Sequence, residues 1–170
     1  MKDAEADPKR DQATTASLEN DLGIVLFALQ DKPEAKSHFK RSLDIRARLL
    51  GPFHADTIGS RHNYISAISD LGGRAKALEL HEQAFMLAKA SDGQDSLAAH
   101  LCAVELAGEL AVQGKLDRIM EILPQSADWL GRTLGPSHPA TVKAGKILAK
   151  ALSGPGGPLA GLFGPQGPRG

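Results

Sequence analysis

The sequence has little cysteine, few aromatic residues and no excess of either charge, and each shortage excludes a class of protein. The one cysteine among 170 residues, Cys102, cannot form an internal disulfide, which is typical of a reducing compartment. Lysine and arginine together number 20, as do aspartate and glutamate, so the formal net charge is zero. That balance argues against a nucleic-acid partner and against an anionic membrane surface. With five Phe, one Tyr and one Trp, the core must be mainly aliphatic.

Long apolar segments are also missing. No run approaches the roughly 18 consecutive apolar residues that a membrane-spanning helix needs. The N-terminal stretch MKDAEADPKRDQ is polar and has no apolar signal core, so export is not expected. We therefore predict a cytoplasmic protein without a membrane partner, of a length that suits one domain.

The sequence does contain an internal repeat. The segment LGPFHADT at 50–57 returns as LGPSHPAT at 134–141, which is 84 residues later. Gly51, Gly93 and Gly135 are separated by steps of 42 residues. A constant step of this size is typical of repeat proteins built from stacked units. Two further rows of mostly apolar residues keep the same step: Leu22, Tyr64, Leu106 and Leu148, and Leu26, Ile68, Leu110 and Leu152.

Each 42-residue unit is predicted to form two helices joined by a turn. Apolar residues recur at helical spacing, and glycine or proline marks the places where a helix ends or begins. One helical hairpin cannot bury its apolar stripe alone, so neighbouring hairpins must stack. The predicted fold is therefore all-α: an α-solenoid of stacked antiparallel helix hairpins with about seven helices. No strand pattern is found.

Composition divides the chain into three segments. Residues 1–14 are polar and are predicted to be a disordered N-terminal segment. Residues 15–152 form the repeat domain, with about 3.5 units and boundaries near 51, 93 and 135. Residues 153–170 contain seven glycines and four prolines, which predicts a flexible tail.

Two local features qualify this division. The tail contains a small apolar cluster, Leu159, Leu162 and Phe163, which could dock back onto the protein as an internal ligand. Pro124 falls inside the second helix of the third unit, where it removes a backbone hydrogen bond and crowds the preceding turn. We expect a kink or a break near Leu123.

Candidate catalytic or metal-binding residues are few. No His-x-x-x-His or Cys-x-x-Cys pair is present, so neither a metal site nor a cofactor is expected. His54 and His138 occupy equivalent positions in the repeat and are predicted to cap the helix that follows. His38 and His81 are expected at solvent-facing positions, and Cys102 is expected to be a small buried residue. No catalytic residue is predicted, and the protein is not expected to be an enzyme.

These features resemble the tetratricopeptide repeats of the kinesin-light-chain type, whose units have the same 42-residue length as those found here. In that family a helix ends in Leu-Gly, followed by Pro-x-His or Pro-x-Asp, a small residue and Thr, as at 50–57 and 134–141. Its first helices often contain Asn-Asn-Leu-Ala, of which NDLG at 20–23 and HNYI at 62–65 are looser versions. The resemblance covers roughly residues 15–152. It implies a right-handed superhelix whose first helices line a concave, peptide-binding groove.

The resemblance also implies which residues face the groove. They form three zones: a polar to acidic zone, an apolar middle with small residues, and a cationic end on one face of the last helix. Asn63 is the most specific of them, because the family uses an asparagine there to hold peptide main chain. The predicted groove residues are Asn20, Asp21, Ile24, Phe27, His62, Asn63, Ser66, Asp70, Leu101, Val104, Glu105, Gly108, Lys143, Lys146 and Lys150.

The predicted function is that of a non-enzymatic adaptor, which binds a peptide segment with an apolar anchor and an acidic end. Two other interpretations of the groove stay open. The lysines could form a solubilising cap, and the apolar helix 97–112 could simply be buried. Two alternative functions also stay open. The chain could be a structural or self-associating scaffold module whose incomplete last unit stacks on a second copy, or a regulatory fragment of a larger multidomain protein.

Overall fold

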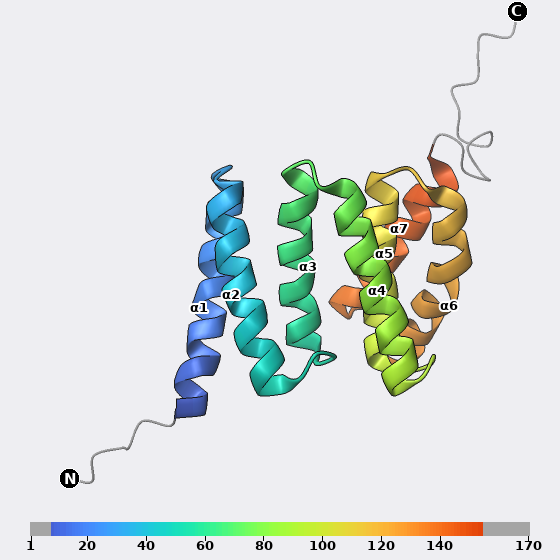
Figure 1. Ribbon diagram of the computed structural model, residues 1–170. Helices are drawn as coiled ribbons and strands as arrows, with labels where there is room; N and C mark the ends of the chain where they lie inside the picture. The colour runs from blue at the N-terminus through green and yellow to red at the C-terminus, as the bar shows by residue number, and fades with distance from the viewer. Residues whose placement is uncertain (1–7, 155–170) are drawn as a thin grey trace, which may run out of the picture. The chain divides into compact units, whose positions relative to one another are not determined.

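The computed structural model describes residues 8–154, and this part of the chain consists of seven α-helices (Figure 1). They are α1 (Pro8–Ala28), α2 (Lys32–Leu50), α3 (Ala55–Asp70), α4 (Arg74–Asp92), α5 (Leu97–Val112), α6 (Leu116–Leu134) and α7 (Pro139–Ser153). No strand occurs between residues 8 and 154. The all-α prediction is confirmed, and the helices alternate as first and second members of hairpins. The apolar cluster predicted in the tail lies outside the described residues.

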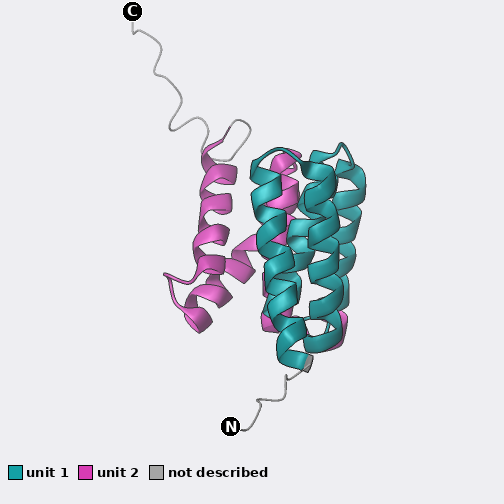
Figure 2. Cartoon of the chain, turned by 90° about the vertical axis from the view of Figure 1, so that its left-hand side faces the viewer, with its two compact units in different colours: residues 1–88 teal, residues 89–170 magenta. Residues whose placement is uncertain are grey.

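The chain divides into two compact units, residues 1–88 and residues 89–170 (Figure 2). In the first unit α2 packs against both α1 and α3, and in the second unit α6 packs against both α5 and α7. A second helix is therefore covered by the first helix of its own hairpin and by the first helix of the next. This is how stacked hairpins bury apolar stripes that one hairpin would leave exposed.

Each connection between the described helices contains one residue with left-handed backbone. These residues follow one another at intervals of 21, which is half the repeat length that the sequence analysis found. A left-handed residue lets the chain leave a helix sharply, and glycine adopts that conformation without strain. In chain order they are Gln30 (φ 67°), Gly51 (89°), Gly72 (92°), Gly93 (90°), Gly114 (69°) and Gly135 (88°).

Side-chain caps begin several of these helices. Nδ1 of His54 accepts a hydrogen bond from the backbone N–H of Asp56 at 3.2 Å, and Nδ1 of His138 accepts one from Ala140 at 3.2 Å. The predicted capping role of both histidines is confirmed. Ser96 caps α5 in the more usual way, through its hydroxyl. Each cap satisfies a backbone N–H that would otherwise have no partner within its helix.

Helix α1 begins earlier than the sequence indicated. It starts at Pro8, so residues 8–14, which were predicted to be part of a disordered segment, are helical. Proline is well tolerated in a first helical turn, and Asp11 there complements the helix dipole. The hydroxyls of Thr14 and Thr15 donate to the carbonyls of Arg10 and Asp11. This turn has no apolar stripe, which is why hydrophobic periodicity did not reveal it.

Helix α6 runs through Pro124 without the predicted break. Leu123 beside the proline is fully buried, as are Ile119 and Leu130 on either side. Burying each such side chain contributes about 1.5–3 kcal/mol, which together exceeds the roughly 3 kcal/mol cost of a proline inside a helix. Packing on both sides of the proline therefore keeps the helix continuous.

Two histidines are less exposed than predicted. His81 is 3% exposed, and its ring lies 5.7 Å from that of His62 on α3. His38 is half-buried, and its Nδ1 lies 2.7 Å from Oε2 of Glu19 on α1. Both side chains face a first helix, so the prediction that they face solvent is wrong. The prediction for Cys102 is confirmed, since this residue is buried in α5.

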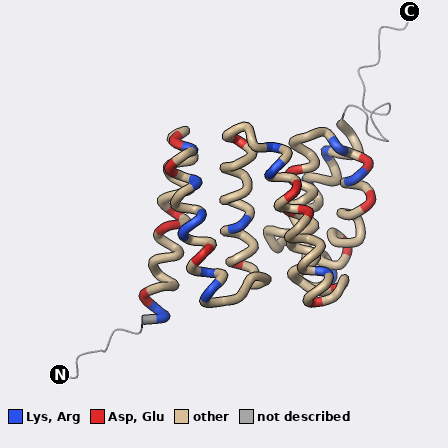
Figure 3. Tube along the Cα trace, viewed as in Figure 1, with Lys and Arg blue, Asp and Glu red and all other residues tan. Residues whose placement is uncertain are grey.

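None of the helices between residues 8 and 154 is both long and apolar enough to cross a membrane. Helix α1 is basic only at its start and carries acidic residues alone beyond Arg10, whereas basic and acidic residues are interspersed along α2 (Figure 3). Mixed charge of this kind suits exposed helical faces, where ions of opposite sign stand one turn apart. Lys40 and Asp44 form such a pair on α2, at 2.5 Å.

Candidate functional site

The first unit contains a small pocket of about 110 Å³ between α1 and α3. Its lining comes from both first helices and from one second helix. Four of its five residues were predicted for the groove, and the structure brings them together although they lie about 40 residues apart in sequence. The lining residues are Ile24, Phe27, Phe39, Asn63 and Ser66.

Phe39 forms the floor of this pocket and was not predicted. It lies on α2 and is 3% exposed, with its ring centroid 6.3 Å from that of Phe27. A Cβ atom at Gly23 would lie 2.6 Å from two carbons of the Phe39 ring. Glycine at position 23 therefore lets the ring pack directly against the α1 backbone. The family pattern has alanine at this position, and that departure was the one sequence signal for the pocket floor.

Amide side chains form one edge of the pocket. Nδ2 of Asn63 donates a hydrogen bond to Oδ1 of Asn20 at 2.9 Å, which joins α3 to α1. Nδ2 of Asn20 in turn donates to Asp21 at 3.5 Å. A carboxamide has two N–H donors and a carbonyl with two lone pairs, so one hydrogen bond leaves most of its capacity for a ligand. The predicted polar zone is thus a connected set of donors and acceptors.

An ion pair lies near Phe27, one of the residues that line the pocket. Nζ of Lys32 lies 2.8 Å from Oδ2 of Asp70, and it also lies 5.7 Å from the centroid of the Phe27 ring. Asp70 was predicted for the groove, whereas Lys32 was not, because it belongs to a second helix. The lysine balances the charge of the aspartate, so the pair adds no net negative charge beside Phe27. It also holds the aromatic side of the pocket by a cation–π contact.

In the second unit the predicted groove residues on α5 differ from one another in burial. Val104 is 1% exposed, so the prediction that it lines a groove is wrong. Helix α5 is apolar on nearly all faces, and ten of its residues are buried. The apolar side chains that the family resemblance predicted to face a ligand therefore pack mainly into the protein core. Leu101 and Gly108 are half-buried, and a Cβ atom at Gly108 would meet nothing within 4 Å.

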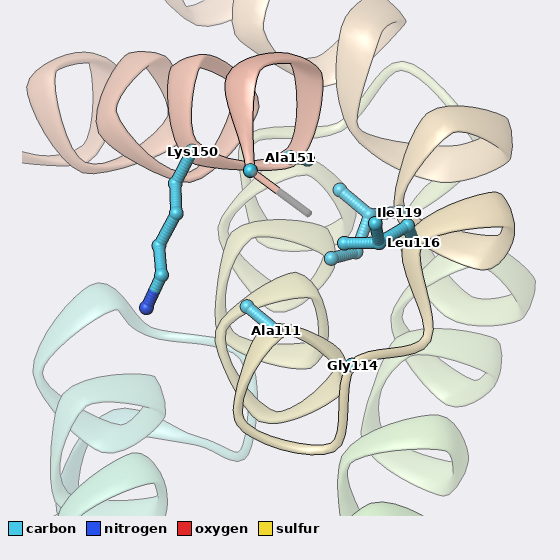
Figure 4. A pocket seen from close by; sticks show the side chains of 7 residues that line it. Ala111, Gly114, Leu116, Ile119, Lys150 and Ala151 are labelled. Atoms are coloured by element: carbon cyan, nitrogen blue, oxygen red, sulfur yellow. The ribbon is translucent and has the colours of Figure 1, made fainter. Parts of the chain in front are cut away.

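The predicted lysine stripe on α7 is divided. Lys143 forms an ion pair with Glu105 of α5, another predicted residue, so two members of the site neutralise one another. Lys146 and Lys150 are exposed. Lys150 stands at the edge of a second, apolar pocket of about 230 Å³. Figure 4 shows its side chain extending past Ala111, away from Leu116 and Ile119. Gly114, Ala151 and Gly154 complete the lining.

Two titratable groups have shifted pKa values, and both serve the fold. Burial raises the pKa of Glu19, but hydrogen bonds from His38 (2.7 Å) and Arg41 (2.9 Å) lower it further, so the net shift is downward. Burial lowers the pKa of His100, and the nearby carboxylate of Asp95 opposes this only in part. The part of the chain described, residues 8–154, has no group of three or more His, Cys, Asp or Glu residues that could hold a metal ion.

Comparison with known proteins finds similarity to tetratricopeptide repeats. Residues 14–90 match the model of the tetratricopeptide repeat family. Among solved structures, the chain is similar to the nearly identical TPR-like repeats of a Podosopora anserina protein assigned as a kinesin light chain. The identity is 22% and the TM-score 0.65, over 84% of this chain and 67% of that chain. A single-residue variant of those repeats gives 23% identity and a TM-score of 0.63, over 82% and 66%.

The predicted resemblance to tetratricopeptide repeats of the kinesin-light-chain type is confirmed, and the fold is a helical repeat solenoid. The chain spans about two thirds of the length of the solved chains that it matches. No curated protein sequence matches it. Tetratricopeptide repeats are generally protein–protein interaction modules and not catalytic folds.

Proposed function

We propose that this protein binds a peptide segment of a partner protein, with an apolar side chain of the peptide seated in the α1–α3 pocket. The observation that carries this proposal is the convergence of Ile24, Phe27, Asn63 and Ser66 on one pocket. A volume of about 110 Å³ suits a single side chain, whereas small-molecule sites are usually about 300–1,000 Å³. The lining therefore favours a peptide anchor over a metabolite.

The amides at the pocket edge are suited to peptide main chain. Asn20 and Asn63 lie on neighbouring first helices and already share a 2.9 Å hydrogen bond, so their orientations are set before a ligand arrives. Such preorganisation lowers the entropic cost of binding. An extended peptide offers alternating N–H and C=O groups, which match the remaining donors and acceptors of two carboxamides.

Within the second unit, the lysines of α7 are proposed to bind an acidic peptide segment. Lys146 and Lys150 are exposed, and Lys150 borders an apolar pocket that could take a second side chain. Lys143 contributes less, because Glu105 already pairs with its charge. Exposed lysines add more to the association rate and to salt dependence than to affinity at high salt.

The proposal is tested with a peptide phage-display library, whose selected peptides are then measured by fluorescence anisotropy. We expect a consensus with one bulky apolar residue and an acidic end. Asn63→Ala should weaken binding of a selected peptide about tenfold, in line with loss of one well-formed hydrogen bond and its neighbours. Ile24→Glu should abolish binding, because it places a charge in the pocket.

A matched control is Gln125→Ala, which removes an amide at an exposed position on α6. Its affinity for the same peptide should equal that of the wild type. If neither Asn63→Ala nor Ile24→Glu changes the affinity, while circular dichroism shows both variants folded, the pocket is not the binding site. Lys146→Glu with Lys150→Glu should weaken only those peptides that carry acidic residues.

A further inference from the structure

Helix α1 carries an exposed apolar stripe, which we name the α1 stripe. It consists of Leu18, Leu22, Val25 and Leu29, with exposed fractions of 64%, 46%, 53% and 72%. Leu29 continues the helix by one residue, since its N–H donates to the carbonyl of Val25 at 2.9 Å. The four exposed side chains together present on the order of 400 Å² of apolar surface, which is in the range of the largest apolar patch on a typical soluble monomer, and such patches are often functional.

In α3 two of the four equivalent positions are covered, whereas Leu71, which corresponds to Leu29, is 44% exposed. Positions 18 and 25 correspond, one repeat of 42 residues later, to Ser60 and Ala67, and both are fully buried. The hydroxyl of Ser60 lies 3.1 Å from that of Ser42 on α2, and Ala67 packs with Phe39 of α2. Leu18 and Val25 therefore occupy positions that α2 covers in α3.

The α1 stripe is not built for that same packing. Serine and alanine on α3 let α2 approach closely, whereas Leu18 and Val25 at the equivalent positions would hold such a helix away. Successive stripe residues are separated by four, three and four positions, which is the heptad spacing of helices that pack side by side with interdigitated leucines. The stripe therefore suits another helix that carries the same pattern.

We propose that the α1 stripe binds the α1 stripe of a second copy of this chain, in a dimer with twofold symmetry. A stripe of this kind is complementary to itself, as an interface of that symmetry requires. Between residues 18 and 29 the only charged residues are Glu19 and Asp21. Glu19 is held by His38 and Arg41 of α2, so pairing of the stripes leaves it with its partners.

The dimer is expected to be weak. Two stripes bury on the order of 800 Å² in total, which is below the roughly 1,200–2,000 Å² of stable complexes. We therefore expect dissociation in the micromolar range. This surface is separate from the peptide pocket, whose lining contains no residue of the stripe.

Sedimentation velocity on the full chain, from low micromolar to several hundred micromolar, tests the proposal. The mass should rise with concentration from 17.9 kDa toward twice that value. The double variant Leu18→Lys, Val25→Lys should stay monomeric over the same range. Both positions are exposed, so its helical circular dichroism and melting temperature should match those of the wild type.

The control replaces a different exposed apolar pair, Met86→Lys with Leu87→Lys on α4, which are 62% and 59% exposed. This variant should dimerise like the wild type. The proposal is overturned if the wild type stays monomeric throughout, if the folded Leu18/Val25 variant still dimerises, or if only the α4 variant loses the dimer. A wild-type monomer would instead leave the stripe to a helix of another protein.

Discussion

At the residue scale, Gln30 is the exception in a row of glycines. It adopts the same left-handed backbone as the five glycines that follow it at intervals of 21 residues, but it has a side chain that crowds the carbonyl beside it. We predict that Gln30→Gly raises the free energy of unfolding by about 0.5–1 kcal/mol, after the greater flexibility of unfolded glycine is subtracted. Urea unfolding of both proteins measures the difference.

Gly72→Ala is the converse of this change. A Cβ atom at Gly72 would meet nothing within 4 Å, so its cost is that of the backbone conformation alone. We expect it to lower the free energy of unfolding by about 1 kcal/mol. If Gln30→Gly destabilises the protein while Gly72→Ala behaves as expected, the prediction for Gln30 is wrong. The side chain of Gln30 would then stabilise the fold by more than its left-handed backbone costs.

His100 makes the stability of the second unit depend on pH. Its ring is 3% exposed, stacks 4.4 Å from that of Trp129, and has its Nδ1 3.1 Å from the hydroxyl of Ser126. Because burial lowers its pKa below the usual 6.5, the unfolded chain takes up a proton first as the pH falls. The neutral His100 ring therefore contributes fully to the free energy of unfolding above about pH 6.5, and this contribution is lost at lower pH.

The variant His100→Gln removes the titrating ring and keeps a hydrogen-bonding group. We expect the difference in unfolding free energy between wild type and variant to shrink between about pH 7.5 and about pH 5.5, because only the wild type loses this contribution. All other residues are the same in both proteins, so the difference isolates the contribution of His100. Chemical denaturation at several pH values measures this, and a difference that is constant with pH would contradict it.

At the scale of elements, the contact between α1 and α2 depends on Gly23. Alanine would add about 1 kcal/mol of helix propensity at this position, but its Cβ atom would lie 2.6 Å from the Phe39 ring. Overpacking of this kind costs about 1–3 kcal/mol. We therefore predict that Gly23→Ala destabilises the protein, against the propensity scale, and displaces Phe39 into the pocket.

Thermal unfolding and peptide affinity together measure this effect. Both the melting temperature and the affinity of a selected peptide should fall. In the double variant Gly23→Ala, Phe39→Leu the smaller side chain makes room, so the melting temperature should recover in part. An unchanged melting temperature in Gly23→Ala alone would show that α1 can move away from α2 without cost.

The sequence was sufficient for those elements whose signals are local. Turn glycines, helix caps at His54 and His138, and apolar residues at helical spacing all act within a few residues, so seven helices could be placed. The start of α1 had no apolar signal, and the continuity of α6 through Pro124 depends on packing. The pocket floor was missed because Phe39 reaches the site only when α1, α2 and α3 meet.

The predicted groove residues also show that features which depend on packing cannot be predicted from sequence alone. Asn63, Ile24, Phe27 and Ser66 were placed by analogy with a family, and the fold does bring them together in one pocket. Val104 was placed by the same analogy and is buried, because its helix serves the core on nearly every face. Position in a repeat predicts which way a residue points, but the size of neighbouring side chains decides whether it reaches the surface.

At the scale of the whole molecule, the division into two units predicts that the first can fold alone. Its core, which includes Phe39, Ile65 and Ala67, comes from α1, α2 and α3. In stacked repeats stability is roughly a sum of units and of contacts between neighbours, so one end can be removed without unfolding the other. We expect residues 1–92, which end with α4, to remain helical and to unfold cooperatively.

Circular dichroism of this fragment during a thermal ramp is the measurement. Its melting temperature should lie below that of the full chain, because fewer neighbours contribute. A fragment that ends at residue 71, without α4, is the control and should be less stable still. Loss of all helical signal in residues 1–92 would mean that the two units fold only as a single cooperative body.

Even spacing of the chain reversals has a consequence for how such a protein can change its length. Each reversal comes 21 residues after the last, so the chain advances in equal steps, one helix and its connection at a time. Duplication or deletion of 42 residues would return every later helix to its former role, whereas a change of 21 would exchange the roles of first and second helices. Growth by whole hairpins therefore needs no adjustment elsewhere, and growth by half a hairpin would turn buried faces toward water.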